Sequence, residues 1–302
     1  MAYLRRLPKF EYLPAQNIAE VCTLLADHGE RAELLAGGTD LLLQMRRREI
    51  SPAYVIGLKG VVELSGVQAS EDGGLTIGAM TTMHALLSSS AIRERYGVLA
   101  QATAGIGGPE LRNVATIGGN IAGALPCADM PPALITLGAK VKLKSRRGER
   151  ILPVDELYPE FGRTVAQEDE LLTAVLLPSV PAVSGGAYLK FHDRQSMDMT
   201  TIGVSAVVTL DADGRAFRDV KIALASSAPV PMRARRAESV LRGLPYTAKA
   251  LEKAASIVCD EADPRSSWRA SRDFRLELLH GLTKRAIGRA WDNAAHTAKD
   301  VS

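Results

Sequence analysis

Two glycine turns stand where an apolar, strand-like segment gives way to a helix-like one, and a turn of this kind can bind an anion. The first turn comprises Ala36, Gly37, Gly38, Thr39 and Asp40, and the second comprises Thr116, Gly118, Gly119 and Asn120. Glycine carries no Cβ and tolerates positive φ, so successive backbone N–H groups can converge on a phosphate toward which the following helix points its positive end. Two such turns suit a diphosphate.

The same turns also have a plainer interpretation. A glycine pair before a helix is often no more than a tight turn, and the carboxylate of Asp40 would repel a phosphate. We expect Asp40 to cap the helix with its side chain turned away, while its backbone N–H remains available. Neither turn alone decides between an anion site and a simple turn.

The sequence excludes several other sites for nucleotides and metals. It contains neither the G-x-G-x-x-G fingerprint of a Rossmann fold nor the G-x-x-x-x-G-K-S/T of a P-loop. Its three cysteines, Cys22, Cys127 and Cys259, lie far apart and form no C-x-x-C pair. They cannot assemble a zinc site or an iron–sulfur cluster by themselves. We expect any such cluster to belong to a partner.

The composition is that of a folded globular protein. Of 302 residues, 46% are hydrophobic and 24% are charged, and the formal net charge is only +3. These values argue against disorder and give no reason to expect a nucleic-acid partner. The sequence has no run of about 18 apolar residues and no apolar leader segment, so we expect a cytoplasmic protein without a membrane span.

Apolar periodicity predicts that helices and strands are mixed in the first part of the chain. Asn17 followed by Glu20 resembles a capping box and predicts a helix over about 18–28. Short apolar runs such as "PAYVIGL" and "LTIGAM" suit buried strands, and helical segments such as "GVLAQATAGI" stand between them. Proline, serine and glycine concentrate in "PSVPAVSGG", residues 178–186, and indicate a domain boundary.

The segment beyond this boundary is expected to form a small antiparallel sheet with helices. Asp213-Gly214 lies between two strand-like segments and predicts a hairpin, because a tight hairpin turn requires positive φ. Helices are expected at about 247–260 and 272–293. The second of these has apolar residues at spacings of four, which would give it one apolar face.

Several motifs in a fixed order identify a family. "AGGTDLL" precedes "TIGGN" by some 80 residues, "PCADMPPAL" follows, and "YLKFHDRQSMDMTTIGVSA" and "SSAPVPMRARRAE" lie beyond the boundary. In this order the chain resembles, over nearly its whole length, the FAD-binding medium subunit of the molybdenum hydroxylases, the family of carbon monoxide dehydrogenase and xanthine dehydrogenase. The resemblance implies that the glycines let the backbone approach the FAD pyrophosphate.

The resemblance also implies a fold and a division into domains. The fold would be α+β, with a two-lobed FAD-binding domain of the vanillyl-alcohol oxidase type over residues 1–178. Its lobes would span about 1–55 and 56–178. A C-terminal flavoprotein domain with an antiparallel sheet and helices would follow over 183–302, and the flavin would lie between the two domains.

Three further cofactor contacts are implied by the resemblance. Asp129, in "CADMPP", matches an acidic position that binds a sugar or ribityl hydroxyl, although a capping or surface role would also explain it. Leu172, with Leu171, matches an apolar stretch near the isoalloxazine, and core packing explains it equally well. Lys190 resembles a lysine that reaches the flavin, where a cation would stabilise the negative charge that appears on reduction. A solvated lysine at a strand end is the alternative for Lys190.

The implied function is electron exchange within a larger enzyme. In the family, a large subunit with a molybdenum cofactor acts on the substrate, a small subunit with 2Fe–2S clusters carries the electrons, and FAD exchanges them with an external carrier. The resemblance implies these two partners, arranged as a dimer of heterotrimers. No catalytic residue of its own and no metal ligand are expected on this chain.

Two alternatives remain at this point. A self-contained FAD-dependent oxidase or reductase of the same fold would need acid–base residues over the flavin, and the sequence offers no convincing set. A binding or assembly module would use the glycine turns only as turns, and would hold no flavin.

Overall fold

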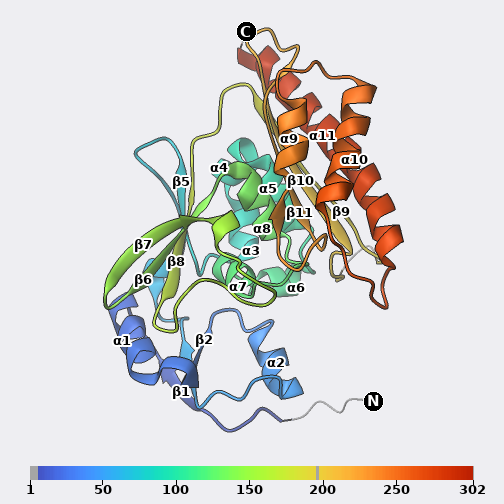
Figure 1. Ribbon diagram of the computed structural model, residues 1–302. Helices are drawn as coiled ribbons and strands as arrows, with labels where there is room; N and C mark the ends of the chain where they lie inside the picture. Colours follow the sequence, from blue (N-terminus) through green and yellow to red (C-terminus); the bar gives the residue numbers. More distant parts are fainter. Residues whose placement is uncertain (1–5, 195–196, 302) are drawn as a thin grey trace.

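In the part of the chain that the structure describes, three sheets follow one another along the sequence (Figure 1). The computed structural model describes residues 6–194 and 197–301. In this part of the chain, no helix is long and apolar enough to cross a lipid bilayer. Helices and strands are mixed throughout, as expected for an α+β protein.

The first lobe is a three-stranded parallel sheet in the order β1-β3-β2. Its elements are β1 (Glu11–Pro14), α1 (Ile18–His28), the 3-10 helix η1 (Gly29–Arg31), β2 (Ala32–Leu35), α2 (Leu41–Arg47) and β3 (Tyr54–Gly57). The predicted helix over 18–28 is confirmed, and Oδ1 of Asn17 accepts a hydrogen bond from the amide of Glu20 at 2.9 Å. The core of this lobe also includes Leu58 and Leu64, which follow β3.

The second lobe is an antiparallel sheet in the order β4-β5-β8-β6-β7, with helices beside it. Its strands are β4 (Val67–Ala69), β5 (Leu75–Gly78), β6 (Lys140–Ser145), β7 (Gly148–Pro153) and β8 (Leu171–Leu177), and its 3-10 helices are η2 (Val62–Leu64) and η3 (Val154–Glu156). Its helices are α3 (Met83–Ser88), α4 (Ser90–Arg95), α5 (Gly97–Ala104), α6 (Pro109–Arg112), α7 (Ile117–Ala122) and α8 (Met130–Leu137). Strands β6 and β7 form the hairpin of the charged segment "KLKSRRGER".

The C-terminal domain is an antiparallel sheet in the order β12-β11-β10-β9, followed by helices. Its elements are β9 (Ser184–Phe191), β10 (Ile202–Leu210), β11 (Phe217–Ala225), β12 (Met232–Arg233), α9 (Arg235–Leu241), α10 (Ala248–Glu261) and α11 (Arg272–Val301). The predicted hairpin is confirmed, and Gly214 in its turn has a φ of 66°. Helix α9 was not expected. The helix predicted over about 272–293 is longer than expected: α11 continues to Val301, because no proline or glycine interrupts it after residue 293.

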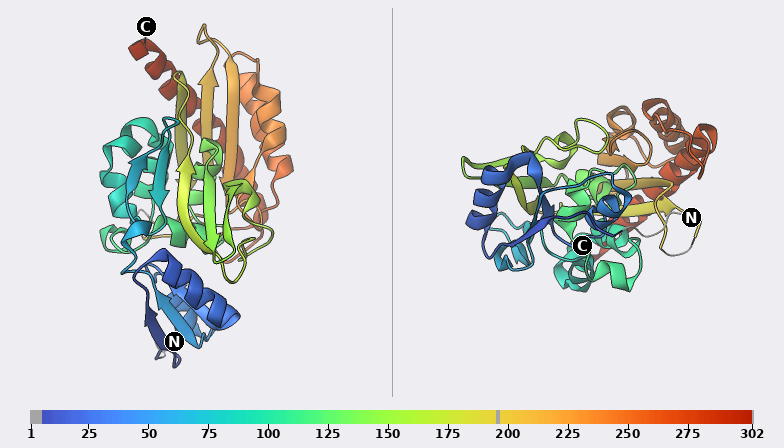
Figure 2. Two further views of the ribbon diagram at one scale, coloured as in Figure 1. Left: turned by 90° about the vertical axis from the view of Figure 1, so that its left-hand side faces the viewer. Right: turned by 90° about the horizontal axis from the view of Figure 1, so that it is seen from below.

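The C-terminal sheet is covered by helices on both of its faces (Figure 2). Its own helices α9 and α11 pack on one face, while α8 and α5 of the second lobe cover the other, where α8 contacts β10 and β11 and α5 contacts β9. A buried hydrogen bond of 2.7 Å joins the hydroxyls of Thr136 on α8 and Ser205 on β10. The two domains therefore share this interface as part of their cores.

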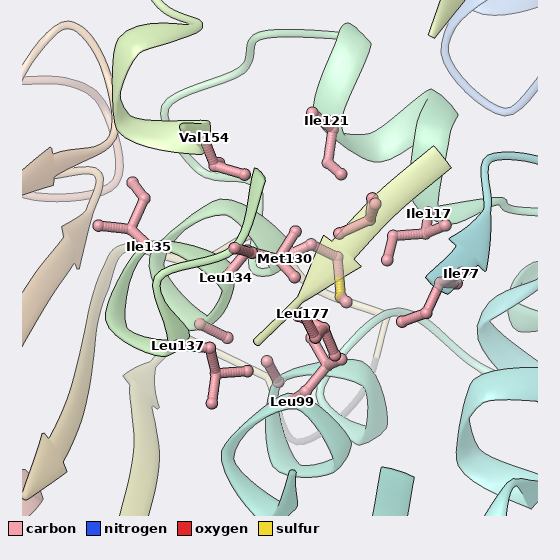
Figure 3. Close-up of a cluster of buried hydrophobic side chains, with 14 of the residues drawn as sticks. Ile77, Leu99, Ile117, Ile121, Met130, Leu134, Ile135, Leu137, Val154 and Leu177 are labelled. Carbon is pink, nitrogen blue, oxygen red and sulfur yellow. The ribbon is translucent and has the colours of Figure 1, made fainter. Parts of the chain in front are cut away.

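The apolar core of the second lobe fixes the helices that carry the second glycine turn and Asp129. Ile117 and Ile121 of α7 and Met130 of α8 are fully buried in this core (Figure 3). Burial of side chains of this size contributes about 1.5–3 kcal/mol each. The polar ends of α7 and α8 are thus held in place by apolar side chains only one or two residues away.

A single added methyl group tests how closely β9 packs on α11. A Cβ on Gly185 would lie 2.2 Å from the backbone nitrogen of Ala294, so Gly185→Ala must push the helix away from the strand. We expect the free energy of unfolding, measured by urea denaturation, to fall by about 1–3 kcal/mol. Gly281→Ala is the control, because Gly281 lies in the same helix with open space around it. That variant is expected to gain about 0.5–1 kcal/mol, and equal losses in both would contradict the packing argument.

Candidate functional site

The first glycine turn lies between β2 and α2 and packs against the residues just before the second turn. Gly38 has a φ of 70°, a left-handed conformation that glycine adopts at no steric cost. A Cβ on Gly37 would lie 2.1 Å from the carbonyl oxygen of Val114, so only glycine allows this approach. Val114 lies two residues before Thr116. The structure thus brings together two turns that are far apart in the sequence.

The backbone amides of the first turn are available to a ligand. No hydrogen bond joins the amides of residues 36–40 to a backbone carbonyl of any described residue. Asp40 occupies the N-cap position of α2, but its side chain makes no capping hydrogen bond. The expectation that this carboxylate caps the helix is therefore wrong. Its backbone already has helical angles, φ −102° and ψ −50°, whereas a capping side chain requires an extended backbone.

The second turn forms the start of α7, and its glycines allow close packing. The amide of Gly118 donates to the carbonyl oxygen of Ala79 at 2.8 Å, and the amide of Gly119 donates to Oγ1 of Thr116 at 3.1 Å. A Cβ on Gly118 would lie 2.7 Å from the Cβ of Ala79, whereas one on Gly119 would lie 3.0 Å from Oγ1 of Thr116 and 3.9 Å from the Cβ of Ala36. Gly118 is required for packing, while Gly119 keeps the space toward the first turn open.

Asn120 connects the second turn to α8. Its Oδ1 accepts a hydrogen bond of 3.4 Å from the amide of Met130, the first residue of α8. Asp129 occupies the N-cap position of this helix, yet its carboxylate makes no capping hydrogen bond. The carboxylate of Asp129 is therefore next to the second turn and directed at partners outside its own helix.

Asp129 is the centre of a buried hydrogen-bond network with the C-terminal domain. Its Oδ1 accepts hydrogen bonds from the hydroxyls of Tyr188 at 2.5 Å and Thr200 at 2.6 Å, and its Oδ2 accepts one from Nζ of Lys190 at 3.0 Å. A carboxylate offers about four acceptor positions, so one position remains for a further donor. Burial, reinforced by the charge of Asp129, raises the pKa of the Tyr188 phenol well above its ordinary value, and Tyr188 therefore remains a donor.

Lys190 is a buried cation and not a solvated lysine at a strand end. Its side chain is only 8% exposed, and besides Asp129 its Nζ donates to the carbonyl oxygen of Gly105 at 2.7 Å. Gly105 is the C-cap residue of α5, and a cation at a helix C-terminus is favourable. The lysine on β9 thus joins two helix ends of the second lobe.

A cavity of about 160 Å³ opens beside Lys190. It lies between the loop after α5 and the segment after β9, and its lining includes Gly105, Arg112, His192, Met197 and Asp198. The guanidinium of Arg112 donates to the carbonyl oxygens of Ile106 at 2.9 Å and Gly107 at 3.1 Å. The loop that forms one wall of the cavity is therefore held by the cations Arg112 and Lys190.

Leu172 on β8 is connected to the second turn through its neighbour. The carbonyl oxygen of Thr173 accepts a hydrogen bond from the amide of Ala79 at 2.9 Å, and Ala79 accepts the amide of Gly118. Leu172 itself is partly buried and packs against the core of the second lobe, while Leu171 belongs to the core of the first. Both core packing and contact with a ligand account for an apolar residue here.

Sequence reasoning missed two members of this site, Tyr188 and Thr200. Tyr188 stands two residues before Lys190 on the same strand, and residues at this spacing lie on the same face of a sheet. The period of two could therefore have indicated Tyr188. Thr200 follows a loop, and no pattern in the sequence places it near Asp129.

Comparison with known proteins shows the family to which the chain belongs. Residues 8–180 match the family described as the FAD binding domain in molybdopterin dehydrogenase, and residues 187–290 match the CO dehydrogenase flavoprotein C-terminal domain. The chain belongs to this family. The resemblance to the FAD-binding medium subunits of the molybdenum hydroxylases is thereby confirmed, and the chain is a FAD-binding oxidoreductase subunit.

Relatives of this medium subunit match it over almost their whole length. It is 36% identical over 280 residues to the xanthine dehydrogenase FAD-binding subunit of Escherichia coli O157:H7, covering 92% of this chain and 95% of that one. The structure of carbon monoxide dehydrogenase from Hydrogenophaga pseudoflava, which lacks the Mo-pyranopterin moiety, superimposes with a TM-score of 0.92 at 32% identity, covering 95% and 99% of the two chains. Quinoline 2-oxidoreductase from Pseudomonas putida 86 gives a TM-score of 0.89 at 28% identity, covering 96% and 99%. The two-lobed fold of the medium subunit is thus the fold of this chain.

The residues of the site fit the diphosphate of FAD. The first turn offers amides with no backbone acceptor among the described residues, and a diphosphate would satisfy such donors. Gly119 leaves room opposite Ala36, which a larger side chain would fill. No group of three or more His, Cys, Asp or Glu side chains in the described ranges could hold a metal ion.

Proposed function

We propose that this chain is the electron-exchange subunit of a molybdenum-containing hydroxylase or dehydrogenase. It would pass electrons between 2Fe–2S clusters of a partner subunit and an external donor or acceptor. The observation that carries this proposal is the family match across both domains, residues 8–180 and 187–290. The proposal includes a FAD-binding domain over 1–178, with lobes of about 1–55 and 56–178, and a C-terminal domain over 183–302.

Each part of the site has a separate role in this proposal. The amides of residues 36–40 hold the diphosphate, and the second turn, Thr116 to Asn120, forms the wall beneath it. Asp129 offers its remaining acceptor position to a hydroxyl of the cofactor, and Leu172 provides an apolar contact for the ring. Lys190 places a positive charge beside the reducible ring. FAD supplies the redox chemistry, since it links one-electron clusters to two-electron carriers.

The partners are a large subunit with the molybdenum cofactor and a small subunit with 2Fe–2S clusters, in the cytoplasm and as a dimer of heterotrimers. Support comes from the names of relatives, which are medium chains or FAD-binding subunits of larger enzymes. Examples are the carbon monoxide dehydrogenase medium chain of Hydrogenophaga pseudoflava and the xanthine dehydrogenase subunit described above. The sites for substrate and for the clusters would therefore lie on the partners.

The isolated chain should bind FAD and lack turnover. We expect the purified protein to show the two visible absorption bands of an oxidised flavin, and its flavin to remain oxidised with purine, aldehyde, aromatic or carbon monoxide substrates. The reason is that the first electron acceptor lies on another subunit. Absorption spectra before and after anaerobic addition of each substrate provide the measurement.

The possible results separate the three functions. Reduction of the flavin by a substrate in the isolated chain would favour the self-contained oxidase or reductase. Absence of flavin after reconstitution with FAD would favour a binding or assembly module. A flavin that stays oxidised until the two partner subunits are added supports the proposal.

A further inference from the structure

The ion pair of Asp129 and Lys190 lies where three elements of two domains meet. Asp129 is at the N-terminus of α8, Gly105 is at the C-terminus of α5, and Lys190 projects from β9. The side chains of Lys190 and Asp129 are only 8% and 9% exposed. Each charge has the sign that its helix end favours, negative at an N-terminus and positive at a C-terminus. The pair is therefore held by backbone dipoles as well as by mutual attraction.

The two oxygens of Asp129 have different partners. Oδ2 binds the ammonium of Lys190 at 3.0 Å, while Oδ1 receives the hydroxyls of Tyr188 and Thr200 at 2.5 and 2.6 Å. The two hydroxyl donors stabilise the carboxylate and draw part of its negative charge away from Lys190. They also fix the carboxylate group, so that Oδ2 stays directed at the ammonium.

The backbone around these donors is fixed as well. The amide of Tyr188 donates to Oε1 of Gln101 on α5 at 2.9 Å. The carbonyl oxygen of Thr200 accepts a hydrogen bond from the hydroxyl of Ser226 at 2.8 Å. Thr200 is 3% exposed and Tyr188 is 6% exposed. Both hydroxyls are thus presented to Asp129 from positions that the fold determines, and water does not compete for them.

We propose that Tyr188 and Thr200 are positioning residues that act through Asp129 on Lys190, and thereby set how much positive charge the flavin experiences. The proposal rests on the function proposed above, in which Lys190 lies beside the reducible ring. Without either hydroxyl, the carboxylate keeps more of its negative charge facing Lys190. The ammonium is then more fully neutralised, and the reduced, negatively charged flavin loses stabilisation. The flavin reduction potential consequently falls.

The test compares hydroxyl deletions with substitutions that keep the hydroxyl or remove one elsewhere. Tyr188→Phe and Thr200→Val remove one donor each, while Thr200→Ser retains the donor. Tyr96→Phe is the matched control, because Tyr96 is a buried tyrosine whose hydroxyl donates to the carbonyl oxygen of Pro178 and does not contact Asp129. Flavin potentials are measured by redox titration of the full-length proteins, together with FAD content.

We expect the potential to fall in Tyr188→Phe and Thr200→Val, and to stay at the wild-type value in Thr200→Ser and Tyr96→Phe. The Lys190→Met variant is itself expected to have a lower potential. In that background the further change in potential caused by Tyr188→Phe should be smaller than in the wild type, because Tyr188 is proposed to act through Lys190. Unchanged potentials in Tyr188→Phe and Thr200→Val at normal FAD content would overturn the positioning role. Wild-type protein that binds no FAD would refute the proposed function instead.

Discussion

Gly119→Val protein is expected to fold and to lose its FAD. The added Cβ would lie 3.0 Å from Oγ1 of Thr116 and 3.9 Å from the Cβ of Ala36, so the side chain would enter the space between the two glycine turns. In the proposed site this space receives the diphosphate. A steric misfit of about 1–3 kcal/mol corresponds to a loss of affinity of about fivefold to 150-fold. We expect the flavin absorption of the purified variant to fall accordingly, while its circular dichroism stays that of the wild type.

Two further variants make this result specific. Gly97→Val is the control, because a Cβ on Gly97 meets nothing within 4 Å, and this variant should retain its FAD. Gly118→Ala should lose folding stability as well as FAD, because its Cβ would lie 2.8 Å from the carbonyl oxygen of Ala79. Full flavin occupancy in a folded Gly119→Val protein would show that the diphosphate lies elsewhere.

Asp129→Ala is expected to destabilise the protein strongly, because it leaves the ammonium of Lys190 buried without its counter-ion. Removing one partner of a buried ion pair costs about 3–5 kcal/mol. The substitution also leaves the buried hydroxyls of Tyr188 and Thr200 without the carboxylate oxygen to which they donate, and this adds to the loss of stability. Denaturant unfolding of the apoprotein measures the effect without any contribution from bound cofactor.

A double variant separates the charge effect from general damage. Asp129→Ala combined with Lys190→Met should cost less than the sum of the two single substitutions, because no charge is left unpaired. Glu160→Ala is the matched control, since Glu160 pairs with Arg163 at the surface, where both side chains are well exposed. An exposed pair of this kind contributes about 0–1 kcal/mol. Additive losses in the double variant would contradict a coupled pair.

The sequence predicted the elements whose signals are local. The helix at 18–28 has its own cap at Asn17, and the hairpin at Gly214 has the residue that its turn requires. The N-cap residue of helix α9, Ala234, has no capping side chain, and the first amides of the helix donate instead to the carboxylate of Glu261 on α10. Glu238 of α9 is buried and binds Arg233 and the amide of Ile222. Tertiary contacts of this kind leave little trace in a pattern of apolar residues.

The sequence indicated individual residues of the candidate site but not the hydrogen bonds that connect them. Motifs of the family indicated Asp129 and Lys190 separately, and nothing in their spacing showed that they form a pair with each other. The glycine turns looked equivalent in sequence, yet the glycine amides of the second turn have acceptors in the Ala79 carbonyl and the Thr116 hydroxyl, whereas the amides of residues 36–40 have no backbone acceptor among the described residues. Such differences depend on hydrogen-bond partners, which only the three-dimensional arrangement specifies.

The helices that cover the C-terminal sheet come from both domains, and this limits how the domains can be exchanged between related enzymes. Helices α5 and α8 cover one face of the sheet, so a chimaera joined between β8 and β9, at residues 178–183, would pair the sheet of one enzyme with the helices of another. The mismatch would occur at Thr136 and Ser205 and at the Asp129 network. A crossover that carries α5 and α8 together with the C-terminal domain would keep these contacts intact. If the Asp129 network tunes the flavin as proposed, the segment that must be exchanged to transfer this property is larger than the C-terminal domain itself.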